Sequence, residues 1–340
     1  MIVRHALAAL VVFALVATGC GDDGGSSSDV PSGSITVYSG RNEELIGELV
    51  TRFEESTGVD VSVRYGDSPA LAATLREEGD NSPADVFFAQ DPASLGAIAE
   101  EGMFARLPDD LLGLVPGEFS DRDGRWVGTS GRARTIVYDT SQLAPADLPA
   151  DVQALTAPEW RGRLAIAPAN GSFVAFVATM ILTDGEEATA AWLAAVAAND
   201  PGTYSENSVI VAAVDGGEIE AGLVNHYYLL RREAEEGDVS AANHFFANGG
   251  PESLVMPAGA GVLATSDNEE AALAFIEFLL ATESQQYFAD ETFEFPLIAG
   301  VDPDPRLPAI SDLDPPDIDL SDLAGALDTA TDLIADAGLL

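Results

Sequence analysis

The chain has 340 residues and a formal net charge of −42, from 57 acidic side chains and 15 basic side chains that are all arginine. A surface this acidic repels phosphate backbones and anionic lipid headgroups, which argues against nucleic-acid binding and against membrane attachment through surface charge. The length exceeds that of one ordinary domain, and a hydrophobic fraction of 47% is sufficient for well-packed cores.

The first 20 residues have the pattern of a bacterial lipoprotein signal peptide. Arg4 precedes a charge-free stretch from Ala6 to Thr18 that is too short to span a membrane, and small residues lead into Cys20 as in a lipobox. The alternative, a buried core cysteine, fits this position poorly. Residues 21–33 are rich in Gly, Ser and Asp and are expected to form a flexible tether. We therefore expect an exported protein whose only membrane contact is an acylated Cys20, at the outer face of the cytoplasmic membrane.

After the tether, segments with strand and helix patterns alternate. In the first helical segment the apolar side chains recur at helical spacing, acids occupy the first turn, and Gly58 follows the end. The predicted elements are strands at 34–38, 59–65 and 84–89, and helices at 43–56, 69–78 and 92–101. Such alternation is typical of βαβ units that build a parallel sheet covered on both faces.

The same alternation returns after an irregular stretch at 107–125. The predicted strands lie at 163–167, 220–225, 253–257 and 261–265, and the predicted helices at 173–182, 186–199, 209–214, 227–237, 269–280 and 323–340. The Pro- and Asp-rich residues 302–319 are expected to run over the surface. Two α/β domains are therefore expected.

Motifs for catalysis are missing from the sequence. There is no Gly-x-Ser-x-Gly, His-Glu-x-x-His or Gly-Lys-Ser/Thr motif, and the mature chain would keep one cysteine and two histidines, too few for a typical zinc site. Abundant carboxylates leave an extracellular carboxylate-based hydrolase as an alternative, although acids spread this evenly are typical of a solvated surface. We expect a protein that is not an enzyme.

Two pairs of residues have side chains that are able to bind charged ligands. Arg132 and Arg134 precede an apolar run, and their guanidinium groups can define an anion pocket or can pair with neighbouring acids. Tyr227 and Tyr228 follow a predicted strand, where a turn into a helix would let both phenol groups converge. Phenolate oxygens are hard donors that suit Fe³⁺, whereas the alternative is an amphipathic pair that caps the sheet edge.

Several blocks of the sequence carry a family resemblance. They are Ile35-Thr36-Val37-Tyr38-Ser39-Gly40, Ser82-Pro83-Ala84-Asp85-Val86-Phe87, Trp126-Val127-Gly128-Thr129-Ser130-Gly131-Arg132, Glu206-Asn207-Ser208, Val224-Asn225-His226-Tyr227-Tyr228 and Phe293-Glu294-Phe295-Pro296-Leu297. With these blocks the chain resembles the periplasmic ferric-ion-binding proteins of ABC transporters, within the type II periplasmic solute-binding proteins. The resemblance covers nearly the whole chain after the tether.

This resemblance implies a fold, a cargo and a partner. The fold would be a two-lobed α/β type II periplasmic-binding-protein fold with mixed, largely parallel sheets and a hinge. Lobe 1 would comprise residues 34–131 and 255–292, and lobe 2 residues 132–254 and 293–340. A monomer would bind Fe³⁺ in the cleft between the lobes and deliver it to an ABC permease.

The resemblance also implies the site residues. Tyr227 and Tyr228 would bind Fe³⁺, and a phosphate or carbonate anion would complete the coordination. The residues expected to contact the anion or ligand are Arg132, Asn170, Gly171, Ser172, Asn207, Asn225, Asn42 and Gln90. Residues 170–172 open a predicted helix, whose free N–H groups suit an anion.

Three positions depart from the family pattern. Asn42 stands where some relatives have a histidine ligand, Gln90 where they have a glutamate, and Phe173 where others have a tyrosine. Iron would then need the anion, water, or a further group, for which the candidates are Asp91, Asp67 and Tyr38. The departures also leave open a different cargo, a small phosphorylated or phosphonate solute held by Arg132, Ser172 and Asn207.

Overall fold

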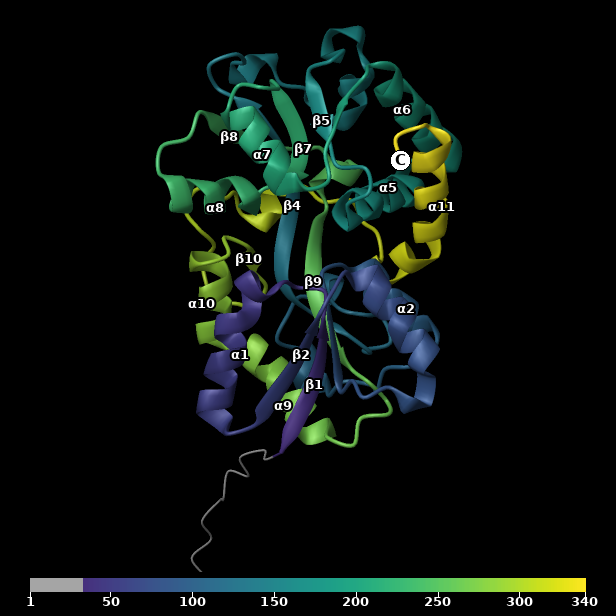
Figure 1. The fold of residues 1–340 in the computed structure, drawn as a ribbon, viewed down its shortest axis with the longest axis vertical. Helices are drawn as coiled ribbons and strands as arrows, with labels where there is room; N and C mark the ends of the chain where they lie inside the picture. Colours follow the sequence, from purple (N-terminus) through teal and green to yellow (C-terminus); the bar gives the residue numbers. More distant parts are fainter. Residues whose placement is uncertain (1–32) are drawn as a thin grey trace, which may run out of the picture. The chain divides into compact units, whose positions relative to one another are not determined.

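The computed structural model of the chain describes residues 33–340 (Figure 1). The predicted signal peptide, Cys20 and all but the last residue of the predicted tether lie outside the described residues. The described residues form one compact unit.

Strands within residues 33–340 join into one mixed sheet in the order β2-β1-β3-β9-β4-β7-β5-β6, and β8 and β10 pair with β4. The bounds are β1 Ser34–Ser39, β2 Asp60–Tyr65, β3 Val86–Ala89, β4 Val127–Asp139, β5 Leu164–Ile166, β6 Gly202–Thr203, β7 Ala221–Asn225, β8 Ala241–Phe245, β9 Val255–Val262 and β10 Phe295–Pro296.

The predicted parallel pairing is found at both ends of the sheet. Strand β1 lies parallel to β2 and β3, and β5 lies parallel to β6 and β7. Every pairing of β4 and β9 is antiparallel. Residues 127–133 of β4 pair with β9, whereas residues 134–139 pair with β7 and β8, so β4 passes from one group of strands to the other (Figure 1).

Helices connect the strands in both groups that β4 joins. Their bounds are α1 Glu43–Thr57, α2 Ser68–Glu78, α3 Pro92–Glu100, α4 Asp109–Leu112, α5 Gly171–Asp184, α6 Glu186–Ala198, α7 Asn207–Asp215, α8 Tyr227–Glu236, α9 Glu269–Leu279, α10 Thr282–Asp290 and α11 Leu323–Asp336. None of the helices in the described part of the chain is long and apolar enough to cross a membrane.

Two lobes result from this arrangement. The first lobe contains β1, β2 and β3 with α1, α2 and α3, and the second contains β5, β6 and β7 with α5 to α8 (Figure 1). A large hydrophobic core of buried side chains runs through both lobes. The residue limits predicted for the lobes remain a proposal.

One predicted pair of strands is a single strand in the structure. The segments at 253–257 and 261–265 are expected from the sequence as separate strands, but β9 is continuous through Gly259 and Gly261. A Cβ atom at Gly259 would lie 2.7 Å from the Val127 carbonyl oxygen, and one at Gly261 would lie 2.8 Å from that of Arg125. The glycines therefore allow close contact with the neighbouring backbone and do not end the strand.

Candidate functional site

The two adjacent tyrosines lie at the junction of β7 and α8. Asn225 ends β7 opposite Arg134 of β4, and Tyr227 begins α8. The rings of Tyr227 and Tyr228 are stacked, with centroids 4.2 Å apart and planes inclined by 26°. Tyr227 is buried and Tyr228 is half-buried. The strand-to-helix turn that the sequence predicted is therefore present, and it places both rings side by side.

His226 anchors this junction. Its Nδ1 accepts a hydrogen bond of 3.1 Å from the backbone N–H of Ala133, and its Nε2 donates to the carbonyl oxygen of Phe293 at 2.7 Å. These partners require the neutral ring with its proton on Nε2. Burial, partly opposed by these hydrogen bonds, lowers the pKa of His226 to about 4. The imidazole therefore fixes the backbone before Tyr227 and is not available as a ligand.

Three arginines surround the tyrosines, and each is at least 95% buried: Arg41 is 0% exposed, Arg132 2% and Arg134 5%. Arg41 makes two hydrogen bonds to the carboxylate of Glu294, at 2.8 and 2.5 Å. Glu294 also accepts hydrogen bonds from Ser130 at 3.3 Å and from Thr292 at 3.0 Å. The Arg41 charge is therefore matched by a carboxylate from the segment before β10.

Arg132 and Arg134 differ in whether they lie beside an acidic side chain or are free to bind an anion. Arg132 donates to the backbone oxygen of Gln90, and its Nε lies 3.9 Å from Glu294. Arg134 donates to Ser172 Oγ at 3.2 Å and to Asn225 Oδ1 at 3.1 Å, with no carboxylate partner among residues 33–340.

Four nitrogen atoms of these two arginines are buried without a hydrogen-bond partner: Nε and Nη1 of Arg132, and Nε and Nη2 of Arg134. Burial, with the neighbouring charge of Arg132, lowers the pKa of Arg134 to about 9, against the opposing influence of Tyr228. Buried guanidinium donors without a partner are suited to an oxyanion.

The electrostatics of the phenols depends on these arginines. Burial and the nearby Tyr228 raise the pKa of Tyr227 well above its ordinary value of 10.0, while the charges of Arg41 and Arg132 oppose that rise. No hydrogen bond of the Tyr227 hydroxyl to residues 33–340 is found. Without a bound cation, Tyr227 therefore stays protonated, and a cation at its oxygen would have to displace the proton.

The predicted anion-contacting segments come together beside Arg134. Asn170 Oδ1 accepts from the backbone N–H of Ser172 at 3.1 Å and from Ser172 Oγ at 2.6 Å. Asn207 Nδ2 donates to Asn170 Oδ1 and to Ser172 Oγ, both at 3.2 Å. Gly171 begins α5 in an exposed position. Most donors of this cluster are thus taken by its own members, which leaves the unpartnered guanidinium nitrogens as the free donors.

Asn42 and Gln90 do not join this cluster by side-chain hydrogen bonds to the described residues. Asn42 is exposed at the start of α1, where its side chain makes no capping bond. Gln90 is half-buried and offers its backbone oxygen to Arg132. Phe173, which stands where some relatives have tyrosine, is fully buried, with its ring 5.8 Å from the Arg134 guanidinium carbon.

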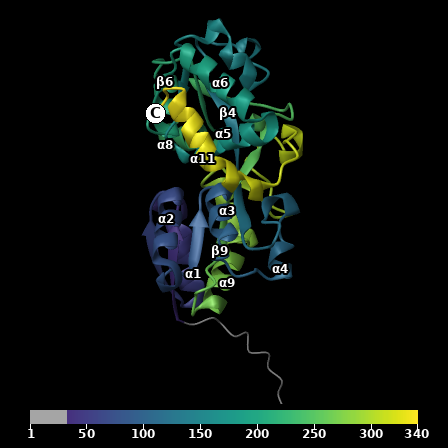
Figure 2. The same ribbon diagram turned by 90° about the vertical axis from the view of Figure 1, so that its right-hand side faces the viewer.

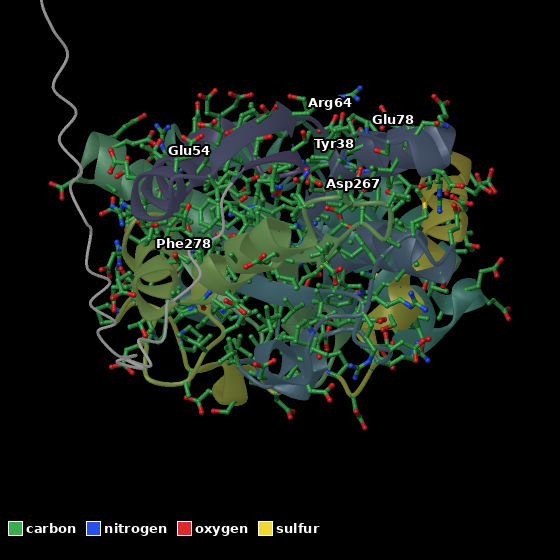
Figure 3. All side chains as sticks on the ribbon, turned by 90° about the horizontal axis from the view of Figure 1, so that it is seen from below. Tyr38, Glu54, Arg64, Glu78, Asp267 and Phe278 are labelled. Carbon is green, nitrogen blue, oxygen red and sulfur yellow. The ribbon has the colours of Figure 1, made fainter. Side chains whose placement is uncertain are left out.

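Of the three further candidate metal ligands, Tyr38 and Asp91 already have hydrogen-bond partners. Tyr38 donates to Glu78 and accepts from Arg64, each at 3.0 Å, as Figure 3 indicates by the placement of these three side chains. Asp91 caps α3 by accepting from Ser94 N and Oγ, at 2.7 and 3.1 Å. Asp67 is exposed before α2. Tyr38 and Asp91 are therefore already occupied by structural contacts.

Sequence reasoning overlooked Arg41 and Glu294 as site residues. They are 253 positions apart, so no local spacing connects them. The available signals were the position of Arg41 beside Asn42 and the presence of Glu294 in the family block 293–297.

The donor set also limits what the site can bind. Among residues 33–340 no three His, Cys, Asp or Glu side chains gather as metal ligands, so a metal at this junction would depend on the phenols.

Two surface cavities, of about 560 and 280 Å³, are lined by residues other than those of the candidate site. One lies around residues 138–147, and the other is lined by parts of 96–125 with Ser321 and Asp322.

Comparison with known proteins identifies relatives along nearly the whole chain. The profile described as "Bacterial extracellular solute-binding protein" matches residues 81–319. The "Fe(3+)-binding periplasmic protein" of Serratia marcescens is 32% identical over 309 residues, which cover 90% of each chain. The "Major ferric iron-binding protein" of Neisseria meningitidis serogroup B is 32% identical over 311 residues, 90% of this chain and 93% of that protein.

A solved structure agrees with these sequences. The crystal structure of iron-bound HitA from Pseudomonas aeruginosa matches with a TM-score of 0.86 and 32% identity, over 90% of this chain and 99% of that chain. The predicted fold class, a two-lobed α/β periplasmic-binding-protein fold, is confirmed by this match. The chain therefore belongs to the family of bacterial extracellular solute-binding proteins, together with these ferric-ion-binding relatives.

Proposed function

We propose that this protein captures Fe³⁺ together with a small oxyanion between its two lobes and delivers the metal to an ABC permease. Tyr227 and Tyr228 are the proposed metal ligands, and the anion, phosphate or carbonate, completes the coordination. The observation that carries the proposal is the stacked tyrosine pair among three buried arginines with unpartnered N–H groups. The names of the relatives support iron as the cargo.

Charge balance supports the need for an anion. Ionised Tyr227 and Tyr228 together with Glu294 and Asp91, whose charge acts on Arg132, would carry four negative charges against the three positive charges of Arg41, Arg132 and Arg134. Fe³⁺ would then leave two uncompensated positive charges in a buried place, which is costly unless anions accompany it. The unpartnered nitrogens of Arg132 and Arg134 are the proposed anion donors, assisted by the cluster of Asn170, Gly171, Ser172, Asn207 and Asn225.

The residues around the two tyrosines have different proposed roles in binding. The charges of Arg41 and Arg132 favour ionisation of the Tyr227 phenol, which burial disfavours. His226 holds the turn that aligns the two rings. Asn42 and Gln90 are proposed as further polar contacts of the ligand. Closure of the lobes would exclude water and strengthen every polar contact with the bound metal. No step in this capture changes the cargo chemically, so the protein is proposed to have no enzymatic activity.

An optical titration tests this proposal. The full chain, purified without chelators, is loaded with a ferric salt in the presence of phosphate or carbonate. Bound tyrosinate should give a visible charge-transfer band that is lost in the Tyr227→Phe/Tyr228→Phe variant and kept in Tyr287→Phe, a matched control on α10. A colourless wild type that also shows no rise in melting temperature on loading would reject iron as the cargo.

A second candidate cargo is a small phosphorylated or phosphonate anion. The observation that favours it is the same group of unpartnered guanidinium nitrogens, of which those of Arg134 lie beside Ser172, while no three His, Cys, Asp or Glu side chains of residues 33–340 gather as metal ligands. A thermal-shift screen separates the two cargoes, because a ligand that binds only the folded state raises the melting temperature. Stabilisation by phosphate esters in the absence of iron would favour this alternative.

The proposed location is the outer face of the cytoplasmic membrane, through an acyl chain on Cys20. A lipid anchor keeps a monomeric carrier near its permease while the tether lets it turn. Cell fractionation tests this point. The wild type should be found with membranes, and a Cys20→Ser variant should be released from them. Equal release of both proteins would argue against the anchor.

A further inference from the structure

The C-terminal segment reaches both lobes. It enters through a short helical turn, Leu320–Asp322, which packs on α3 of the first lobe, and continues as α11. Helix α11 then packs on α3 and, most extensively, on α5 of the second lobe, with a smaller contact on α6. Figure 2 shows α11 running along α5 with its lower end beside α3. This segment is therefore a connection between the lobes in addition to β4.

Polar contacts fix the start of the segment to the first lobe. Ser321 Oγ donates to Asp121 Oδ1 at 3.0 Å and accepts from the backbone N–H of Arg122 at 3.3 Å. The guanidinium of Arg122 pairs with Asp319 at 3.3 Å and also with Asp322. Ser321 is 8% exposed and Asp121 is equally buried, so the hydrogen bond between them is shielded from water, whereas the ion pairs of Arg122 are exposed.

The anchor on the first lobe is itself rigid and closely packed. The other carboxylate oxygen of Asp121 accepts from the backbone N–H groups of Asp123 and Arg125, at 3.2 and 2.9 Å. Gly96 of α3 lies so close to α11 that a Cβ atom there would be 3.0 Å from the Cβ of Ala324. The segment is thus held by close packing as well as by ion pairs.

The other end of the segment is fixed by apolar packing. Leu323, Ala326, Ala330 and Ile334 of α11 are buried in the core that also contains the apolar face of α5. The first turn of α5 carries Ser172, which bonds to Arg134. A displacement of residues 319–322 would therefore be transmitted to α5, the helix that begins at the candidate site.

We propose that residues 319–336 form an interlobe strap that limits the separation of the two lobes. The strap holds α5 to the Asp121–Arg122 loop, so opening must either bend the strap or break its polar contacts with that loop. The proposal does not depend on the identity of the cargo, because every contact in it is between residues of the protein itself.

The distance between the lobes tests the strap in the ligand-free full chain. Spin labels on Glu55→Cys in α1 and Glu187→Cys in α6, both exposed, report that distance in a Cys20→Ser background that removes the one native cysteine. The test variant is Arg122→Ala/Ser321→Ala. The control is Arg76→Ala, which breaks a surface ion pair of 2.7 Å with Glu101 inside the first lobe, at similar exposure.

The test variant should raise the ratio of separated to close lobes by about threefold or more, while the control leaves it unchanged. Hydrogen exchange of residues 319–326 is measured on the same samples and should become faster only in the test variant. Faster exchange with an unchanged lobe distance would overturn the proposal, because the freed segment would then not restrain opening. Unchanged exchange and distance would overturn it as well, as would equal opening in the control.

Discussion

Replacing Glu294 by leucine should destabilise the protein strongly, because Arg41 would keep its charge with no carboxylate beside it. Both side chains are fully buried, and their two hydrogen bonds measure 2.8 and 2.5 Å. Removing one partner of such a pair costs about 3–5 kcal/mol, mostly because the remaining charge is buried without compensation. The equilibrium constant for unfolding should therefore rise by about two to three and a half orders of magnitude.

Urea unfolding of a double-mutant cycle measures this coupling. Glu294→Leu and Arg41→Leu are compared singly and together, with circular dichroism as the readout. The double variant should recover most of the stability lost by either single variant, since no charge is then left unpaired. If the two single losses simply add in the double variant, the pair is not coupled and the reasoning is refuted.

The contribution of the Arg41–Glu294 pair to stability should also depend on pH. Burial alone would raise the pKa of Glu294, but the charge and hydrogen bonds of Arg41, with the charge of Arg132, bring it below its ordinary value of 4.5. A carboxyl group with a lowered pKa in the folded state stabilises the protein above its unfolded pKa and loses that effect as the pH falls through the folded pKa. The stability difference between wild type and Glu294→Leu should therefore be full at pH 7 and shrink below 4.5. An unchanged difference in acid would contradict this prediction.

Three further substitutions, the first with a matched control, test the packing and the site. Gly222→Ala places a Cβ atom 2.1 Å from Ile210 Cγ2 and should cost about 1–3 kcal/mol in urea unfolding, whereas Gly171→Ala meets no atom within 4 Å and should be nearly neutral. Gln285→Leu leaves the backbone N–H of Leu297 and two carbonyl groups without their buried partners and should cost at least about 1–3 kcal/mol by the same assay. Arg134→Leu should weaken the effect of phosphate on the ferric absorption band by about tenfold, and an unchanged phosphate titration would remove Arg134 from the anion site.

Local patterns predicted most of the secondary structure. The helix expected at 43–56 is found as α1 at Glu43–Thr57, because its buried side chains recur at helical spacing and Gly58 adopts a left-handed φ of 76° at the end. Helix α10 was missed because two of its buried side chains, Ser284 and Gln285, are polar and break the apolar pattern. The buried amide of Gln285 is satisfied by three backbone groups outside α10, of which the carbonyl of Thr129 is 156 positions away in the sequence.

The site was predictable only where its residues are neighbours in sequence. Tyr227 and Tyr228 are adjacent, and a strand before a helix pattern was enough to place them at a turn. The pairing of Arg41 with Glu294 arises from the meeting of distant segments, which no local spacing encodes. Likewise, only the fold places Ser172 Oγ within 3.2 Å of the Arg134 guanidinium.

The central claim, that the paired phenols hold ferric iron, is tested most directly by the metal content of the protein as cells make it. The full chain, purified without chelators from iron-replete cells, should contain stoichiometric iron by mass spectrometry of its metals. The Tyr227→Phe/Tyr228→Phe variant, shown to be folded by circular dichroism, should contain almost none. Iron-free wild-type protein, or a double variant that retains as much iron as the wild type, would contradict the account.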